Sequence, residues 1–220
     1  NVPNDLSLRI NGPAITLEAW VKREVGGSGS PGIIDKANYF LYFDGTGATQ
    51  KVIYYLNGVS TSITSNQYLR AGVWYHIVGV YDGSQMKLYI NGVLDNTVAA
   101  SGTINTGTTA LTIGVAYSTA FGNYGNFLKG QVDEARVWSV ARDSSQINYG
   151  MVHTLAGNET GLAGYWRMDE QSGTTTYDAT PNANNGTLTG GTSFTRAGFT
   201  PYRPTNLFAS AVQKKVNLTW

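Results

Sequence analysis

Short β-strands are predicted along most of the chain by its pattern of apolar and polar residues. In residues 15–22 an apolar side chain occupies every second position, which is typical of a strand with one face against a core. Residues 1–13 are expected to form an edge strand, and residues 25–32, 101–109 and 116–126 are expected to form loops. Runs rich in β-branched and aromatic residues predict further strands at 33–36, 39–43, 51–56, 59–64, 73–81, 86–90, 110–115, 127–138 and 161–168.

The most regular stretch is residues 73–95, where Asp82-Gly83-Ser84 separates two strands. Asn91-Gly92 then provides the two positive-φ positions of a type I′ turn, which predicts a third strand after it. Large side chains alternate to both faces of these strands, so we expect both faces to be covered. One face would fill the core of a two-sheet sandwich, and the other would line a concave surface.

One short helix is predicted near residue 143. Asp143 can cap its first turn, and Gln146 at the third helical position can return a hydrogen bond to the cap. The helix should continue to about Met151. Because the rest of the chain has the pattern of strands and turns, we expect an all-β fold in which this is nearly the only helix.

The composition excludes several classes of function. The 220 residues include no cysteine, which rules out disulfides, zinc–thiolate sites and thiol nucleophiles. The formal net charge is +1 and Lys and Arg do not cluster, so we expect no nucleic-acid partner. No apolar run approaches the ~20 residues of a membrane-spanning helix, so we expect no membrane insertion.

Three motifs, in the right order, resemble those of laminin-G-like, concanavalin-A-like jelly-roll domains. The first is Ile15–Lys22, and the third is Gly130–Trp138. The second joins Trp74 and His76 to residues 81–83 and 88–92. The resemblance covers about residues 1–165 and implies a two-sheet antiparallel jelly-roll β-sandwich, which we expect to occupy residues 1–200. It is much less specific for activity, because this fold carries many functions.

The end of the chain resembles two further segments. The pattern Trp-x-x-Asp-Glu-x-x-Gly-Thr, often adjacent to such jelly rolls, occurs at residues 166–174. Residues 204–207 and 216–220 resemble the opening strands of a fibronectin type III domain, so 201–220 are expected to be a linker and the truncated start of that domain. A truncated strand lacks its partners, so we expect 204–220 to be disordered or packed opportunistically. The chain would then be a fragment of a longer multidomain protein.

Asp133 is the first candidate for a chemical role. Strict alternation places its carboxylate on one face with Ala135 and Val137. A buried carboxylate must accept hydrogen bonds, pair with a cation or bind a metal. The resemblance implies a structural calcium ion held by Asp133 and main-chain carbonyls, with Asn4 and Asp5 as further donors. The alternative is that Asp133 accepts backbone hydrogen bonds or pairs with an arginine.

The sequence also contains carboxylates that share strand faces with other functional side chains. Glu18 lies on one face with Trp20, and Glu134 lies on one face with Arg136. We favour a structural ion-pair network around a core Trp over a contact between Glu18, Trp20 and a sugar. Glycosidases need two carboxylates ~5–9.5 Å apart, but no Glu-x-Asp or Glu-x-Glu strand motif occurs. We therefore predict no catalytic residue.

Aromatic and amide side chains gather in the predicted loop 116–126. They are Tyr117, Phe121, Asn123, Tyr124 and Asn126. Aromatic rings can stack on sugars, and amides donate and accept hydrogen bonds at once, which suits vicinal hydroxyls. Alternatively, the rings pack beneath the loop and the amides serve only its turns. Both interpretations stay open, and these five residues form the candidate ligand-binding set.

Together these features predict a non-catalytic module that binds a carbohydrate or another extracellular polymer. We expect it to act as a monomer within a secreted or surface-anchored multidomain protein, bacterial in view of the cysteine-free composition. A structural or adhesive module with an extracellular protein partner is the first alternative. A glycoside hydrolase or lyase is the second.

Overall fold

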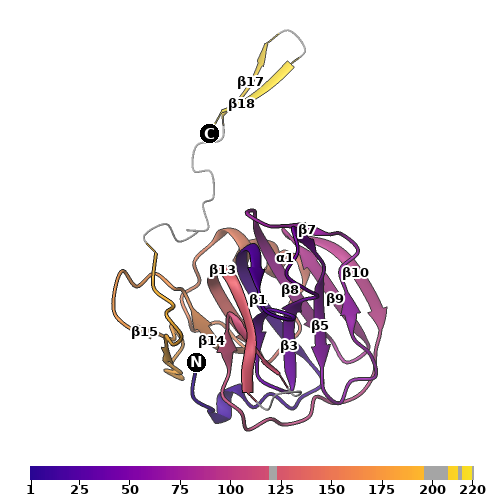
Figure 1. Ribbon diagram of the computed structural model, residues 1–220. Coiled ribbons are helices and arrows are strands. Elements are labelled where there is room, and N and C mark those ends of the chain that lie inside the picture. Colours follow the sequence, from indigo (N-terminus) through magenta and orange to yellow (C-terminus); the bar gives the residue numbers. More distant parts are fainter. Residues whose placement is uncertain (119–122, 196–207, 213–214, 220) are drawn as a thin grey trace.

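The computed structural model, which describes residues 1–118, 123–195, 208–212 and 215–219, confirms a two-sheet antiparallel β-sandwich (Figure 1). The larger, seven-stranded sheet contains β1 (Ile15–Gly27), β8 (Trp74–Tyr81), β9 (Gln85–Ile90), β10 (Val93–Ala99), β12 (Val115–Ser118), β13 (Asn123–Trp138) and β14 (Leu162–Trp166). Its order is β10-β9-β8-β1-β13-β12, and β14 also pairs with β13.

The smaller, five-stranded sheet lies against one face of the larger sheet. It contains β2 (Gly32–Asp35), β3 (Tyr39–Phe43), β5 (Val52–Leu56), β6 (Ile63–Thr64) and β11 (Thr112–Ile113). Its order is β11-β2-β3-β5-β6. Two short antiparallel pairs are separate from both sheets, namely β4 (Thr49–Gln50) with β7 (Leu69–Arg70) and β15 (Thr175–Thr176) with β16 (Gly186–Thr187).

The main core lies between the two sheets and follows the predicted alternation. On β1 the side chains of Leu17 and Val21 are fully buried in the same cluster as Leu41 and Tyr54 of the small sheet. Tyr39, also buried, donates its hydroxyl to the carbonyl of Leu8 at 3.0 Å. Burial of polar tips is therefore compensated by hydrogen bonds to the backbone.

The turn between β9 and β10 has the predicted conformation. Asn91 and Gly92 have φ angles of 51° and 76°, as a type I′ turn requires. Ile77 points into the main core, whereas Val78 packs with Ile147 of the helix in a second cluster. Both faces of β8 are covered, as expected, but the prediction that one of them lines a concave surface was wrong, because the helix buries it.

That helix, α1 (Ser144–Val152), begins as predicted at Asp143. The Asp143 carboxylate accepts a hydrogen bond from the backbone N–H of Gln146 at 2.8 Å, and Gln146 Oε1 accepts one from the N–H of Asp143 at 3.1 Å. The capping box satisfies backbone donors that have no partner inside the helix. No helix among the described residues is long and apolar enough to cross a membrane.

The N-terminal segment does not form the predicted edge strand. Only Val2 makes a bridge, to Leu111, and residues 6–8 form the 3₁₀ helix η1 (Leu6–Leu8). Asp5 caps η1 by accepting a hydrogen bond from the N–H of Ser7 at 2.8 Å. This local bond turns the backbone away from the sheet. The predicted loop 25–32 is also shorter, because β1 continues to Gly27.

Residues 167–195 follow β14 and pack onto the sandwich. Trp166 is fully buried in the main core, and its indole N–H donates to the carbonyl of Asn184 at 2.8 Å. The buried carboxylate of Asp178 accepts hydrogen bonds from the N–H groups of Tyr165, Thr180 and Asn184 at 2.9–3.0 Å. These bonds hold a segment that has only the short β15 and β16 as strands.

Two strands near the end of the chain, β17 (Phe208–Val212) and β18 (Lys215–Thr219), pair with each other. Each strand is therefore the partner of the other, within a segment expected to be disordered or packed opportunistically. The assignment of residues 201–220 to the start of a fibronectin type III domain stays a prediction.

Candidate functional site

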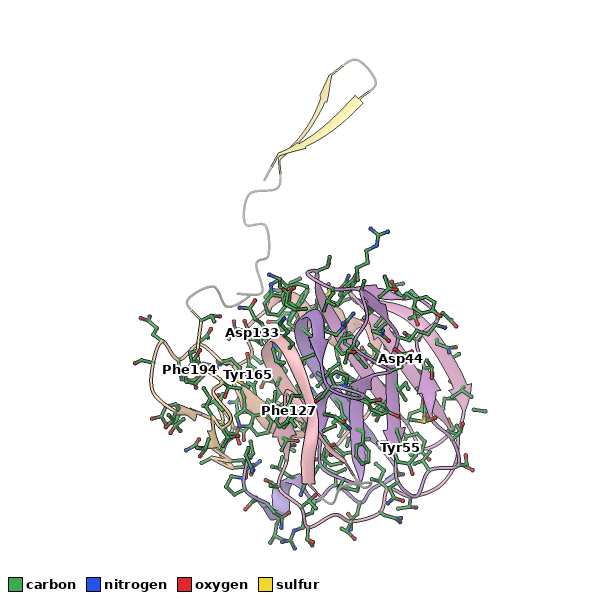
Figure 2. The ribbon with its side chains drawn as sticks, in the orientation of Figure 1. Asp44, Tyr55, Phe127, Asp133, Tyr165 and Phe194 are labelled. Carbon is green, nitrogen blue, oxygen red and sulfur yellow. The ribbon has the colours of Figure 1, made fainter. Side chains whose placement is uncertain are left out.

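The outer face of the small sheet presents a group of partly exposed rings. Alternate residues of β3 and β5 fill the core, which turns Phe40, Tyr42, Ile53 and Tyr55 outward. Phe40 lies opposite Tyr55, with ring centroids 5.5 Å apart and 54° between the ring planes. Tyr55, labelled in Figure 2, is 39% exposed. The other three residues are half-buried. These four residues are called the aromatic face below.

Polar groups lie beside the aromatic face. Thr64 of β6 is opposite Ile53, and the Lys51 ammonium lies 5.0 Å from the ring centroid of Tyr68, which is 62% exposed. Burial and the neighbouring Tyr55 raise the pKa of the Tyr42 hydroxyl, so this group stays a neutral donor at neutral pH. The face therefore combines rings, hydroxyls and a cation on a rigid sheet.

The predicted loop 116–126 instead belongs, in its described residues, to the paired strands β12 and β13, and β12 borders this sheet. Tyr117 pairs with Tyr124, and Asn123 pairs with Ser118. A Cβ atom added to Gly32 of β2 would lie 2.5 Å from the carbonyl carbon of Val115, so β12 runs directly beside β2. The segment lacks clear alternation, which is why its strands were missed.

The five candidate ligand-binding residues are only partly covered by the described structure. Phe121 lies outside the described residues, as do the side chains of Tyr117, Asn123 and Tyr124. Asn126 is half-buried, and its amide oxygen packs against Gly29. A role for these residues in binding therefore stays a prediction. Their strand β12 nevertheless runs directly beside β2.

A buried network of charged side chains lies beneath α1, on the other face of the large sheet. Arg136 donates from Nη1 to Glu18 Oε1 at 2.6 Å and from Nη2 to Glu134 Oε2. His76 Nε2 lies 3.0 Å from Glu18 Oε1, and the Tyr165 hydroxyl donates to Glu134 Oε2 at 2.5 Å. The predicted ion-pair network is confirmed.

This network has no access to a polymeric substrate. The side chains of Glu18 and Arg136 have no exposed surface, and that of Glu134 is 2% exposed. Burial favours the neutral acid of Glu18, but Arg136 and His76 outweigh it and lower its pKa to about 2. Burial raises the pKa of Glu134, against the attraction of Arg136. Trp20 is also buried, with its indole N–H donated to the carbonyl of Met151 at 3.2 Å, so it offers no surface to a sugar.

A β-bulge moves Asp133 from the face that strict alternation predicts. β13 contains one extra residue between the pair Trp20–Asp133 and the pair Glu18–Arg136, and Glu134 has a φ of 52°. Asp133 therefore pairs with Trp20 of β1 and does not share the core-facing side of β13 with Ala135 and Val137. Its Oδ1 accepts a hydrogen bond from the N–H of Glu134 at 3.0 Å, one of the alternatives expected for this carboxylate.

Asn4 and Asp5 do not fit a calcium site. Asn4 Oδ1 accepts hydrogen bonds from two cationic groups, Lys36 Nζ at 2.8 Å and Arg9 Nε at 3.3 Å. Asp5 is exposed and caps η1. The described residues contain no group of three or more His, Cys, Asp or Glu that could hold a metal ion. Calcium binding by Asp133 and main-chain carbonyls stays a prediction.

Asp133 also lines a cavity of about 270 Å³. Its walls come from β12, β13, the first two residues and residues 187–195. Trp74 and Phe194 contribute rings, and Gln131 donates from Nε2 to Thr195 Oγ1 at 2.9 Å at its wall. In Figure 2, Asp133 and Phe194 lie well apart from Tyr55, so the cavity is separate from the aromatic face.

Among solved structures, a candidate carbohydrate-binding protein from Bacteroides ovatus is 20% identical to this chain, with a TM-score of 0.68 over 89% of this chain. This chain spans 59% of that protein. Domain 4 of AbnA, an extracellular GH43 arabinanase from Geobacillus stearothermophilus, in complex with arabinotriose, is 19% identical, with a TM-score of 0.50 over 67% of this chain and 69% of that one. The CBM40 of Ruminococcus gnavus IT-sialidase, bound to α2,3-sialyllactose, is 16% identical, with a TM-score of 0.51 over 66% of this chain and 90% of that one.

At these identities the likeness establishes the fold alone. No curated protein sequence is similar enough to the chain to count as a match. The family described as the concanavalin A-like lectin/glucanases superfamily matches residues 1–148, which is more than half of the chain. This range contains all three motifs found in the sequence. The chain therefore belongs to the concanavalin A-like lectin/glucanases superfamily.

Proposed function

We propose that this chain is a non-catalytic glycan-binding module and that the aromatic face holds the sugar. The observation that carries the proposal is the set of partly exposed rings of Phe40, Tyr42 and Tyr55 on adjacent strands. The apolar faces of sugar rings stack on aromatic rings, and side chains on a sheet lose little freedom on binding. The Tyr42 hydroxyl and Thr64 supply hydrogen bonds to sugar hydroxyls.

Two further observations support a binding role without catalysis. The carboxylates Glu18 and Glu134 are buried and neutralised by Arg136, so they cannot serve as an acid and a base for glycoside cleavage. The arabinotriose and sialyllactose complexes of two proteins with this fold make oligosaccharides the first ligand class to test.

The proposed setting is a secreted or surface-anchored bacterial multidomain protein, in which the module acts as a monomer and a fibronectin type III domain follows it. In such a protein the module would hold the larger chain close to a polysaccharide and so raise its effective concentration there. A structural calcium ion at Asp133 remains part of the proposal.

The proposal is tested by glycan-array binding followed by affinity measurements on single variants. Tyr55→Ala and Phe40→Ala are expected to weaken binding by about tenfold or more, because each removes a stacking surface. Tyr177→Ala is the matched control, since Tyr177 is 61% exposed but lies outside both sheets. Its affinity should stay within about twofold of the wild type.

Other results would redirect or end the proposal. Binding that survives Tyr55→Ala but is lost in Phe194→Ala would move the site to the cavity. Binding to an extracellular protein, with no glycan bound, would favour an adhesive module. Turnover of a polysaccharide by the isolated chain would establish a hydrolase or lyase.

A further inference from the structure

Lys36 is the most completely buried lysine in the described chain. It lies in the turn between β2 and β3, and its side chain has no exposed surface. Lysine is almost never fully buried, because removing an ammonium from water has a large free-energy cost. Groups of the fold must therefore replace the lost water around its charge.

Three oxygens surround this ammonium. Nζ donates to Asn4 Oδ1 at 2.8 Å, to the carbonyl of Thr109 at 2.6 Å and to the carbonyl of Gly107 at 3.4 Å. An ammonium has three N–H donors, so each can have one of these acceptors. The Thr109 hydroxyl also donates to the carbonyl of Lys36 at 3.0 Å, which ties the turn to the same loop. This group of oxygens is called the oxygen cradle below.

The oxygen cradle consists of neutral oxygens. No carboxylate of the described residues lies within 4.0 Å of Lys36 Nζ. A further amide oxygen, Asn38 Oδ1, is buried beside Gly107 with no hydrogen-bond donor among the described residues. Main-chain carbonyls and amide oxygens are also the neutral ligands that hard metal ions take in proteins. The cradle therefore has the donor chemistry of a cation site.

Lys36 keeps its charge near neutral pH in this environment. Burial and the nearby Arg9 guanidinium lower its pKa to about 8, and Asp5 acts in the opposite direction. An ammonium with a pKa near 8 is still mostly protonated at pH 7. The cradle therefore contains a positive charge under ordinary conditions.

We infer that the Lys36 ammonium permanently occupies the oxygen cradle as its cation. Because the chain's own side chain fills the cradle, the cradle binds no metal ion. The cradle joins three segments that are distant in sequence, around residues 4, 36 and 107–109. The inference also accounts for the poor fit of Asn4 to a calcium site. Removal of the side chain should leave a site that accepts a small organic ammonium.

Side-chain ¹⁵N NMR and thermal melting test this inference. The wild type should show a slowly exchanging ammonium signal that disappears in Lys36→Met, and that variant should melt several degrees lower. Lys36→Ala lacks a propylammonium group, so added propylammonium should raise its melting temperature more than that of the wild type. Lys129→Met is the control, because Lys129 is exposed and its loss should leave the melting temperature unchanged.

Four results would overturn the inference. The first is a wild type without a slowly exchanging Lys36 ammonium signal, which requires no variant to fold. The second is a Lys36→Met variant with the melting temperature of the wild type. The third is a Lys36→Ala variant with no specific response to propylammonium. The fourth is calcium chloride displacing the Lys36 ammonium signal in the wild type, since a metal ion would then enter the cradle.

Discussion

Arg136 is the cation that pairs with the buried carboxylates beneath α1. Its guanidinium is shared by Glu18 and Glu134, and it also lies 4.7 Å from the ring centroid of Tyr165. The two carboxylates raise the pKa of Arg136 despite its burial, so it stays charged. A buried pair adds little net stability relative to apolar residues, but one member left alone is strongly destabilising. The network is therefore a structural element with strict pairing.

Arg136→Met is expected to lower the free energy of unfolding by about 3–5 kcal/mol, because it removes the guanidinium that pairs with both buried carboxylates. Urea unfolding measures the change. Lys22→Met is the control, because the Lys22–Glu24 pair is partly exposed and 3.9 Å apart, and its loss should change stability by less than about 1 kcal/mol. Equal effects of the two substitutions would contradict the structural role of the network.

At the scale of elements, α1 decides which surfaces remain for a ligand. It covers the outer face of the large sheet through Ile147, and Gly150 brings its backbone to Arg136, with the carbonyl 2.9 Å from Nη1. The outer face of the small sheet has no helix over it among the described elements. The aromatic face is partly exposed because no helix of the described chain covers it. The sequences of β3 and β5 are no more polar than those of buried strands.

Asp143→Ala should destabilise the domain by about 1 kcal/mol, because the first turn of α1 loses its capping bond to Gln146. Faster amide hydrogen exchange in α1 should accompany the loss. Asp143→Ser is the matched control, since serine also caps helices and should retain most of the stability. If Ser and Ala behaved alike, the capping bond would not be what stabilises the helix.

At the scale of the whole molecule, the folded unit extends beyond the residues that the family matches. The match ends at residue 148, inside α1, whereas β14 completes the large sheet and Trp166 fills the main core. Asp178 then fastens the following segment to β14. Through these contacts and the hydrogen bond from Gln131 to Thr195, the folded unit extends to residue 195.

A chain that ends at residue 160 is expected to be largely unfolded at room temperature. It lacks Trp166, and loss of a core Trp side chain alone costs about 3–5 kcal/mol, a large part of the stability of a typical domain. A chain that ends at residue 195 should melt close to the full chain. Circular dichroism and thermal melting compare the two. A cooperative melt of the shorter chain at the same temperature would show that β14 is dispensable.

Local features were predictable from the sequence because nearby residues determine them. Asn91-Gly92 specifies its turn through backbone sterics, and Asp143 with Gln146 specifies the helix start through two short-range hydrogen bonds. Alternation identified most strands, including β1 and β8. It failed for residues 1–13 and 116–126, where capping bonds or pairing with a neighbouring strand override weak local preference.

The sequence by itself indicated the family through three ordered motifs, the two-sheet class through the alternation of its strands, and an ion pair of Glu18 with Arg136 or a lysine, because a buried charge must be neutralised. Only the tertiary structure decided that α1 covers one sheet and that Tyr55 is exposed and Phe40 half-buried on the other. It also decided that Lys36 meets oxygens from residues 4, 107 and 109. Such contacts join distant segments, and main-chain carbonyls have no signature in the sequence.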